Sequence, residues 1–240
     1  MELTRAGPVT TLVLPGGPLD RRAALELEDA LGELAEDDSD QVRVIVLTAA
    51  GVDFCPGAAE DLRADTSGLD PPSRLLASRR PVVAAISGAC RSVGMAIALA
   101  ADIRIVAATT RFALPEVSEG SLPGWNAAWL TARVVGAARA TPIVLLGEEV
   151  GGEEAVAMGL AHQLAADPAA RATEMAQLLA ARGPLALEYT KEAVWRGAGL
   201  PLGEALRLEA DFNHLLQASS DRAEGLAAFF EKREPRFAGR

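Results

Sequence analysis

The stretch Ser87–Ala107, SGACRSVGMAIALAADIRIVA, lies near the middle of a chain of 240 residues and mixes a long apolar run with charged side chains. Its Ser-Gly dipeptide predicts a turn, after which a helix is expected over residues 92–101. Arg91 and Asp102 interrupt the apolar run, which is shorter than the roughly 20 residues that span a bilayer. The stretch therefore predicts a buried helix in the core of a globular protein.

Apolar strands are predicted on both sides of this helix. PVVAAI (81–86) precedes it and RIVAA (104–108) follows it. Upstream, VTTLVL (9–14) and QVRVIVLTA (41–49) are rich in β-branched residues, and the segment 20–37 carries leucines at helical spacing. Strands that alternate with helices predict an α/β layered body.

The second half of the sequence is mostly helical in pattern. A largely helical segment with Trp125 and Trp129 one turn apart follows Gly124, and GGEEAVAMG predicts another short helix. From Pro184 onward, one helix is predicted after another to the end of the chain. We therefore expect a body over residues 1–185 and a helical region over 186–240.

Charge and cysteine content narrow the classes of function. Lysine and arginine total 23 against 33 aspartates and glutamates, a formal net charge of −10, which excludes generic affinity for nucleic acid or an anionic membrane. Cys55 and Cys90 are too few for a disulfide framework, and no Cys or His cluster has metal-ligand spacing, so no metal is expected. The N-terminal sequence lacks a secretory signal pattern, and we expect a cytoplasmic protein.

Three segments in order resemble one family. GVDFCPGAAEDL (51–62), the long segment 80–124 and DRAEGLAAFFEKREPRFAGR (221–240) are similar to motifs of the crotonase superfamily, also called the enoyl-CoA hydratase/isomerase family. The resemblance runs from about Val9 to the end of the chain. It implies a crotonase-like α/β fold, a spiral of ββα repeats, with C-terminal helices that assemble homotrimers or hexamers.

The resemblance also implies a chemistry and a site. Family members act on acyl-CoA or related acyl-carrier thioesters, with coenzyme A as part of the substrate and no further cofactor. Two backbone N–H groups form an oxyanion hole, which at matching positions are those of Ala58, after Gly57, and Val93, before Gly94. Preorganised donors of this kind are worth about 3 to 4 kcal/mol each to catalysis.

The sequence departs from the family at the positions that carry the chemistry. Three glycines of the family correspond to Ser92, Val93 and Gly94, so only the last is kept. One of the two glutamates that a hydratase uses falls at Ala96, and the other is kept as Glu116. Hydration by two carboxylates is therefore disfavoured.

A single glutamate still serves to move a double bond, as in the Δ3,Δ2-enoyl-CoA isomerases that this pattern resembles most. Glu116 would remove a proton beside the thioester carbonyl and return it two carbons away. An apolar wall for its carboxylate is expected from nearby residues: Leu114, Pro115, Val117 and Trp125. Glu119 either replaces the missing acid or is a solvated charge.

Other residues are expected to bind the substrate or to pack, without a part in the reaction. Arg63 and Lys232 match basic positions that contact the phosphates of coenzyme A, or are surface charges. Phe229 and Phe230 are expected to pack between tail helices or subunits. Packing rather than catalytic roles are expected for the two histidines and two cysteines: His162, His214, Cys55 and Cys90.

Two segments differ from the family segments that surround the active site. The segment from Asp61 to Pro81 is much shorter than the family's, which normally walls the acyl pocket, so the pocket is either open or covered by another element. LPGGPLDRR (14–22) replaces an Asn-Arg-Pro pattern that supports the active-site loop.

Three hypotheses follow from these patterns. The first is a thioester-processing enzyme of lipid metabolism that isomerises a double bond through an enolate. The second is a specialised decarboxylase, dehydratase or hydrolase of a biosynthetic pathway. The third is a catalytically degenerate subunit that serves assembly.

Overall fold

The computed structural model describes residues 1–37 and 41–240, and within them the strands form two sheets. The larger sheet has the order β1-β2-β3-β4-β6-β9, with β1 antiparallel to β2 and the later neighbours parallel. The smaller sheet has the order β5-β7-β8. The strands are β1 Glu2–Ala6, β2 Val9–Leu14, β3 Val44–Ala49, β4 Val82–Ile86, β5 Ala89–Arg91, β6 Ile103–Val106, β7 Arg111–Ala113, β8 Val150–Gly151 and β9 Gln163–Leu164.

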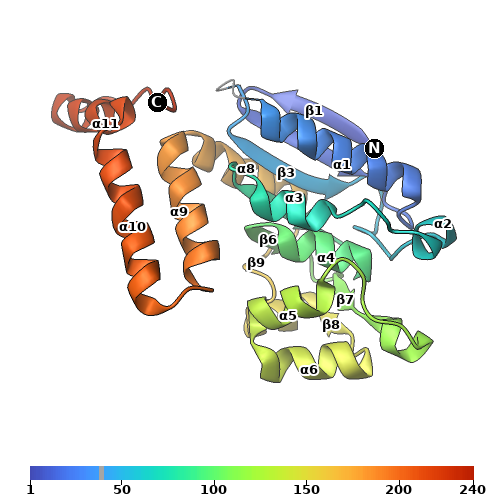
Figure 1. Cartoon of the computed structure of the whole chain (residues 1–240). Helices are drawn as coiled ribbons and strands as arrows, with labels where there is room; N and C mark the ends of the chain where they lie inside the picture. Colours follow the sequence, from blue (N-terminus) through green and yellow to red (C-terminus); the bar gives the residue numbers. More distant parts are fainter. Residues whose placement is uncertain (38–40) are drawn as a thin grey trace.

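Helices cover both faces of the larger sheet (Figure 1). Alternate strand residues supply two apolar clusters, one beneath α8 and a larger one shared with α1, α3 and α4. The helices are α1 Arg21–Glu36, α2 Glu60–Ala64, α3 Pro71–Ala77, α4 Val93–Ala100, the 3-10 turn η1 Pro115–Glu119, α5 Ala127–Val135, α6 Ala137–Leu146, α7 Gly152–Met158, α8 Pro168–Ala180, α9 Pro184–Gly197, α10 Leu202–Gln217 and α11 Ser220–Glu231. Burial on both faces explains the nearly continuous apolar runs of β3 and β4.

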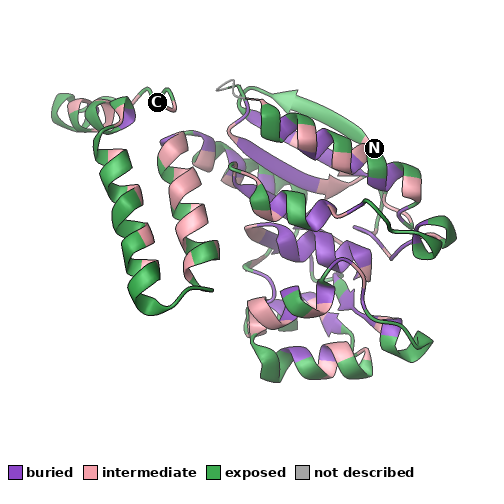
Figure 2. Ribbon diagram, viewed as in Figure 1, coloured by how far each residue is buried: buried purple, intermediate pink, exposed green. Residues whose placement is uncertain are grey.

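Helix α4 is the centre of the larger cluster. All eight of its residues are buried, as its lack of a polar face predicts (Figure 2). Its carboxyl end is closed by Arg104, whose buried guanidinium donates to the carbonyl oxygens of Leu99, Ala101 and Leu160. Burial lowers the pKa of Arg104 to about 10. This arginine therefore satisfies carbonyl groups that a helix end leaves without partners.

The C-terminal helices are attached to the body by polar contacts. Neither α9 nor α10 has a buried residue, and Figure 2 shows α10 largely exposed. Helix α9 is anchored through Lys191, whose Nζ lies 2.8 Å from the carboxylate of Asp102 and also donates to the carbonyl of Arg80. Trp195 Nε1 donates to the same carboxylate at 3.1 Å. Within the described residues, no helix combines the length and apolar character needed to cross a membrane.

Several expectations from the sequence need correction. The strand predicted over 41–49 begins at Val44, and the exposed edge strand β1 was missed because none of its residues is buried. Trp125 precedes α5 with a φ of 50°, so it does not share a helix with the exposed Trp129. Phe229 and Phe230 contact one another edge to face but are 77% and 78% exposed, so they do not pack between helices of this chain.

Candidate active site

The loop after β3 and the strand β5 lie side by side at the carboxyl ends of the parallel strands. Cys55 and Cys90 form a parallel β-bridge. The amide of Cys55 donates to the carbonyl of Ala89 at 3.0 Å, and the amide of Arg91 donates to the carbonyl of Cys55 at 2.9 Å. The two predicted oxyanion segments are thus aligned by backbone hydrogen bonds at their start.

The residues just before the two predicted donors are also close together. A Cβ placed on Gly57 would lie 3.7 Å from the Cβ of Ser92, so these two residues are neighbours. One residue further along each segment are Ala58 and Val93. Ala58 forms its own parallel bridge with Leu19, and Val93 is the first residue of helix α4. The convergence of their amides on one carbonyl oxygen stays a prediction.

The Ala58 amide is held by the peptide units around it. The carbonyl of Gly57, in the same peptide unit, accepts from the amide of Leu19 at 2.8 Å, and the amide of Ala59 donates to the carbonyl of Leu19 at 2.8 Å. Within residues 1–37 and 41–240, the amide of Ala58 has no acceptor. Leu19 lies in the segment 14–22, so the backbone of that segment supports the loop.

The Val93 amide is the first of helix α4. Ser92 precedes it with φ 54° and ψ −127°, a conformation that favours glycine, and it makes no side-chain cap. The amide of Ser92 donates to the carbonyl of Ala113 at 3.0 Å, which fixes the junction against β7. Across the described part of the chain, the Val93 amide also has no acceptor. A strained residue beside a free helix amide is typical of a functional site.

Gly94 has a packing role. A Cβ at this position would lie 2.5 Å from the Cβ and 2.6 Å from the carbonyl oxygen of Cys55. The helix therefore approaches the loop so closely that only glycine fits. Burial raises the pKa of Cys55, and that of Cys90 lies well above the usual range for the same reason, so both cysteines remain thiols and fill space.

Glu116 lies on the turn η1, which begins directly after β7 and Leu114. Its side chain is buried, and neither carboxylate oxygen has a hydrogen-bond partner among the residues the structure describes. Leu114 and Trp125 are buried as the expected apolar wall requires, and the indole Nε1 of Trp125 is also buried without a partner there. Val117 is 39% exposed, so its part in that wall stays a prediction. An unpartnered buried carboxylate is costly for folding, which points to a role in function.

No second carboxylate occupies the position of the missing glutamate. Ala96 is completely buried inside α4. Glu119, the other candidate acid, is about half exposed and forms an ion pair with Arg63 at 3.2 Å. The structure thus favours the interpretation of Glu119 as a solvated charge, and of the two glutamates only Glu116 is buried.

The remaining predicted site residues lie in different places. Arg63 is beside the site, where its Nε donates to the carbonyl of Ala58 at 3.2 Å. Lys232 ends helix α11, which Figure 1 shows at the opposite end of the molecule from α2, so this chain does not bring it to Ala58. Among the described residues, no group of three or more His, Cys, Asp or Glu side chains is arranged to hold a metal ion.

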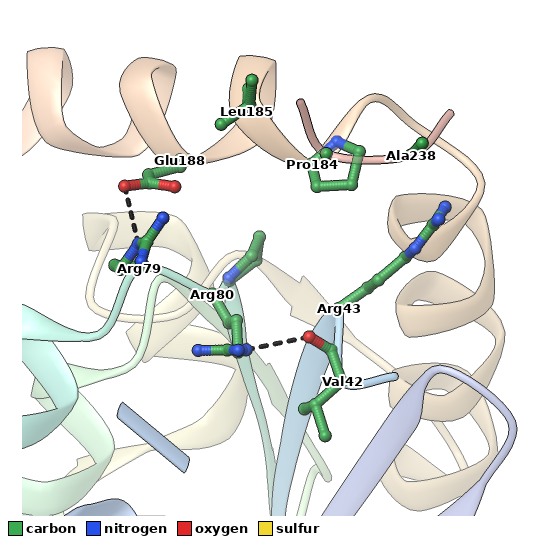
Figure 3. Close-up of a pocket in the computed structure, with 10 residues that line it drawn as sticks. Val42, Arg43, Arg79, Arg80, Pro184, Leu185, Glu188 and Ala238 are labelled. Atoms are coloured by element: carbon green, nitrogen blue, oxygen red, sulfur yellow. Dashed lines mark hydrogen bonds and ion pairs between the residues drawn. The ribbon is translucent and has the colours of Figure 1, made fainter. Parts of the chain in front are cut away.

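An arginine-lined pocket lies at the amino ends of the parallel strands, just before β3 and β4 begin (Figure 3). The arginine side chains of this pocket bind other groups of the same chain. Arg80 donates to the carbonyl of Val42, and Arg79 forms an ion pair with Glu188 of α9. Arg43 donates to the carbonyl of Phe237. This pocket therefore joins the tail to the body and is separate from the candidate active site.

Sequence reasoning missed two features of the site. One is the Leu19 bridge, because a backbone contact between distant segments leaves no local signal. The other is the contact of Arg63 with both the Ala58 carbonyl and Glu119, since ion pairs 56 residues apart cannot be inferred from spacing. A signal for the strain at Ser92 was available, because a serine stands where the family has glycine.

Comparisons with known proteins bear on the fold and the family of this chain. The family model described as enoyl-CoA hydratase/isomerase matches residues 18–240. The chain is 32% identical over 231 residues to the 1,2-epoxyphenylacetyl-CoA isomerase of Escherichia coli, covering 90% of this chain and 87% of the relative. It is 33% identical over 230 residues to the 2,3-dehydroadipyl-CoA hydratase of the same organism, covering 92% and 90%.

Solved structures give the same result. An enoyl-CoA hydratase from Bacillus anthracis superposes with a TM-score of 0.91 at 27% identity, covering 100% of this chain and 99% of the other. An enoyl-CoA hydratase from a Polaromonas species superposes with a TM-score of 0.86 at 26% identity, covering 98% of each chain. These similarities confirm the fold expected from the sequence.

Proposed function

Because this chain belongs to the enoyl-CoA hydratase/isomerase family and is an acyl-CoA-processing enzyme, we propose that it isomerises a double bond with one carboxylate. The observation that carries the proposal is Glu116, buried with both oxygens unpartnered among the described residues, together with a buried alanine at position 96. Relatives are named both as hydratases and as isomerases, so the family alone does not decide between these reactions.

The proposed reaction begins with the thioester carbonyl oxygen between the amides of Ala58 and Val93. Glu116 takes a proton from C2 of a 3-enoyl-CoA, and the electron pair of that C–H bond becomes part of an enolate. The two amides stabilise the negative charge that develops on the oxygen. The protonated Glu116 then gives the proton to C4, the double bond moves to C2–C3, and the carbonyl forms again.

This route needs no water molecule. Besides the protein's own groups it uses only the substrate, which includes coenzyme A, and no separate cofactor. A hydratase must hold and deprotonate water with a second carboxylate. Ala96 offers none, and Glu119 is engaged with Arg63 at 3.2 Å. We therefore place isomerisation before hydration.

Conversion of a 3-enoyl-CoA to its conjugated 2-enoyl isomer tests the proposal, because the product gains an ultraviolet absorption band. The purified protein is expected to produce it. Glu116→Gln should lower kcat by about 10²-fold or more, since it removes a general base, whereas Glu119→Gln should retain most of the activity. Faster hydration of a 2-enoyl-CoA than isomerisation of the 3-enoyl compound would contradict the proposal.

A specialised thioester reaction is the second candidate. It is favoured by the short segment between the loop and β4, where only the small helices α2 and α3 stand in place of a longer wall. Turnover of malonyl-type or 3-hydroxyacyl thioesters at rates above those of 3-enoyl-CoA would support it. Absence of turnover on every thioester class would instead support a degenerate subunit whose role is assembly.

Assembly itself belongs to the proposal. Helices α10 and α11 present exposed apolar side chains that a partner subunit would cover: Leu202, Leu206, Leu215, Leu226, Phe229 and Phe230. Large exposed apolar surfaces are typical of subunit interfaces. We propose a homotrimer, or a hexamer of two trimers, in which Lys232 reaches the coenzyme A bound to a neighbouring subunit.

A further inference from the structure

One guanidinium joins the two halves of the candidate site. Arg63 is in helix α2, directly after the oxyanion loop, and its Nε donates to the carbonyl of Ala58 at 3.2 Å. Its Nη1 donates to Oε2 of Glu119 at 3.2 Å, although 56 residues separate the two in sequence. Glu119 is part of the same short turn, η1, as Glu116.

The turn η1 is otherwise closed by local bonds. The carbonyl of Glu116 accepts from the amide of Ser121 at 2.9 Å and from its hydroxyl at 3.2 Å. Ser118 donates to the carbonyl of Pro115 at 2.6 Å. These bonds shape the turn but do not relate it to the oxyanion loop. Arg63 makes that connection directly.

We propose that Arg63 is a positioning residue, which sets the distance between the Ala58 amide and the Glu116 carboxylate by holding the loop and the turn at once. This inference rests on the proposed function, because it assigns Arg63 a role in that same site. A misplacement of reacting groups by about 1 Å can cost 10²-fold in rate. An ion pair this exposed contributes little to folding stability, so its loss should hardly change the melting temperature.

The variant Arg63→Met tests the inference, because it keeps a long apolar stem and removes every donor. We expect kcat for 3-enoyl-CoA isomerisation to fall by roughly 10-fold or more, with KM changed less than about twofold and the melting temperature nearly unchanged. Arg63→Lys should recover part of the loss, since an ammonium group donates to both acceptors. Glu119→Gln should cost less than Arg63→Met, because the Ala58 contact remains.

Arg74 provides the matched control. Its guanidinium is as exposed as that of Arg63, at 56%, and it pairs at 2.7 Å with Glu28, 46 residues away, on the other side of α3 from the site. Arg74→Met should leave kcat unchanged. The comparison separates a contact with the site from the general loss of one surface ion pair.

Three results would overturn the inference. Unchanged kcat in Arg63→Met, with an active wild type, would show that the connection has no effect on the site. A raised KM with unchanged kcat would assign Arg63 to binding the phosphates of coenzyme A instead. A wild type without any thioester turnover would refute the proposed function itself and this inference with it, which distinguishes the two failures.

Discussion

Gly94 is the residue at which the site leaves no space for a side chain. A Cβ there would lie 2.5 Å from the Cβ of Cys55 and 2.6 Å from its carbonyl oxygen, so the helix and the loop would have to separate. That separation would also move the Val93 amide, which is next in sequence. One glycine thus links core packing to the geometry of the oxyanion hole.

The substitution Gly94→Ala is expected to destabilise the fold by about 1 to 3 kcal/mol, because it overpacks a buried contact. Gly32→Ala is the control, since Gly32 lies within helix α1 with open space around it and should gain about 0.5 to 1 kcal/mol. Urea unfolding of both variants gives the two free energies. A neutral or stabilising Gly94→Ala would refute the close approach described here.

For single residues, the sequence predicted which ones are catalytic candidates. It did not predict the burial and the partners of their side chains. Motif register alone indicated Ala58, Val93 and Glu116. That Glu116 is buried without a partner, and that Glu119 is occupied by Arg63, depends on contacts between segments distant in sequence. Side-chain partners of this kind follow from tertiary packing, which no local pattern encodes.

Helix α9 is attached to the body through several polar contacts, of which the Lys191–Asp102 ion pair is the least exposed. No residue of α9 is buried as a whole, but the side chain of Lys191 is only 8% exposed. Burial lowers the pKa of Lys191 in spite of that pairing, so the ion pair has a desolvation cost as well as an attraction. Removal of the lysine would leave the Asp102 carboxylate without its counter-charge.

Lys191→Met is therefore expected to destabilise the protein by about 3 kcal/mol, as when one partner of a buried ion pair is removed. The other lysine of the chain, Lys232, is exposed, and Lys232→Met should change stability by less than about 0.5 kcal/mol. Denaturant unfolding measures both changes. Equal stability of the two variants would show that the Asp102 contact does not anchor α9.

The C-terminal segment after α11 is held by Glu224. Its carboxylate accepts two hydrogen bonds from Arg233, at 2.6 and 2.9 Å, and one from the amide of Arg236 at 2.6 Å. The Arg233 side chain is the main cause that lowers the pKa of Glu224 from 4.5 to about 2. The carboxylate thus stays ionised until the pH falls towards about 2.

A lowered pKa gives a defined pH dependence. The contribution of Glu224 to docking the segment is complete above about pH 4.5 and is lost as the pH falls towards about 2. Amide hydrogen exchange at Arg236, corrected for its intrinsic pH dependence, should therefore lose protection over that window. Glu224→Gln should show low protection already at neutral pH. Protection that is independent of both changes would contradict the role of this carboxylate.

At the scale of elements, the sequence predicted those with strong patterns. The β-branched runs of β2 and β4 and the leucine spacing of α1 matched the observed bounds within one residue at each end. The short strands β5, β7 and β8 were missed, because two or three residues carry no periodicity and their pairing depends on distant partners. β5 holds Cys90 beside Cys55, so the missed elements are those that align the site.

The tail of the molecule, residues 186–240, presents a group of exposed large apolar side chains. Phe229 and Phe230 are among the most exposed large apolar side chains, and both lie on α11. Burial of such surface is the main driving force of subunit association. The resemblance to a family indicated assembly from the sequence, and the exposure of these rings provides a physical reason for it.

Light scattering on the eluted protein should therefore give a mass of at least three times 25.0 kDa. The double variant Phe229→Ser and Phe230→Ser should dissociate at lower concentration than the wild type, because apolar contact area is lost. Val52→Ser changes an equally exposed apolar residue in a loop of the body and should leave the mass unchanged. A monomeric wild type at all concentrations would refute the proposed assembly.

In the proposed reaction, the buried carboxylate of Glu116 alone carries the proton from C2 to C4. The most direct test uses a 3-enoyl-CoA with deuterium at C2, incubated with the protein in ordinary water. Because the described residues leave the Glu116 oxygens buried, we expect the 2-enoyl product to carry a measurable fraction of the deuterium at C4, and Glu116→Gln to abolish this transfer. A product formed with no label at C4, or formed equally well by Glu116→Gln, would contradict the claim.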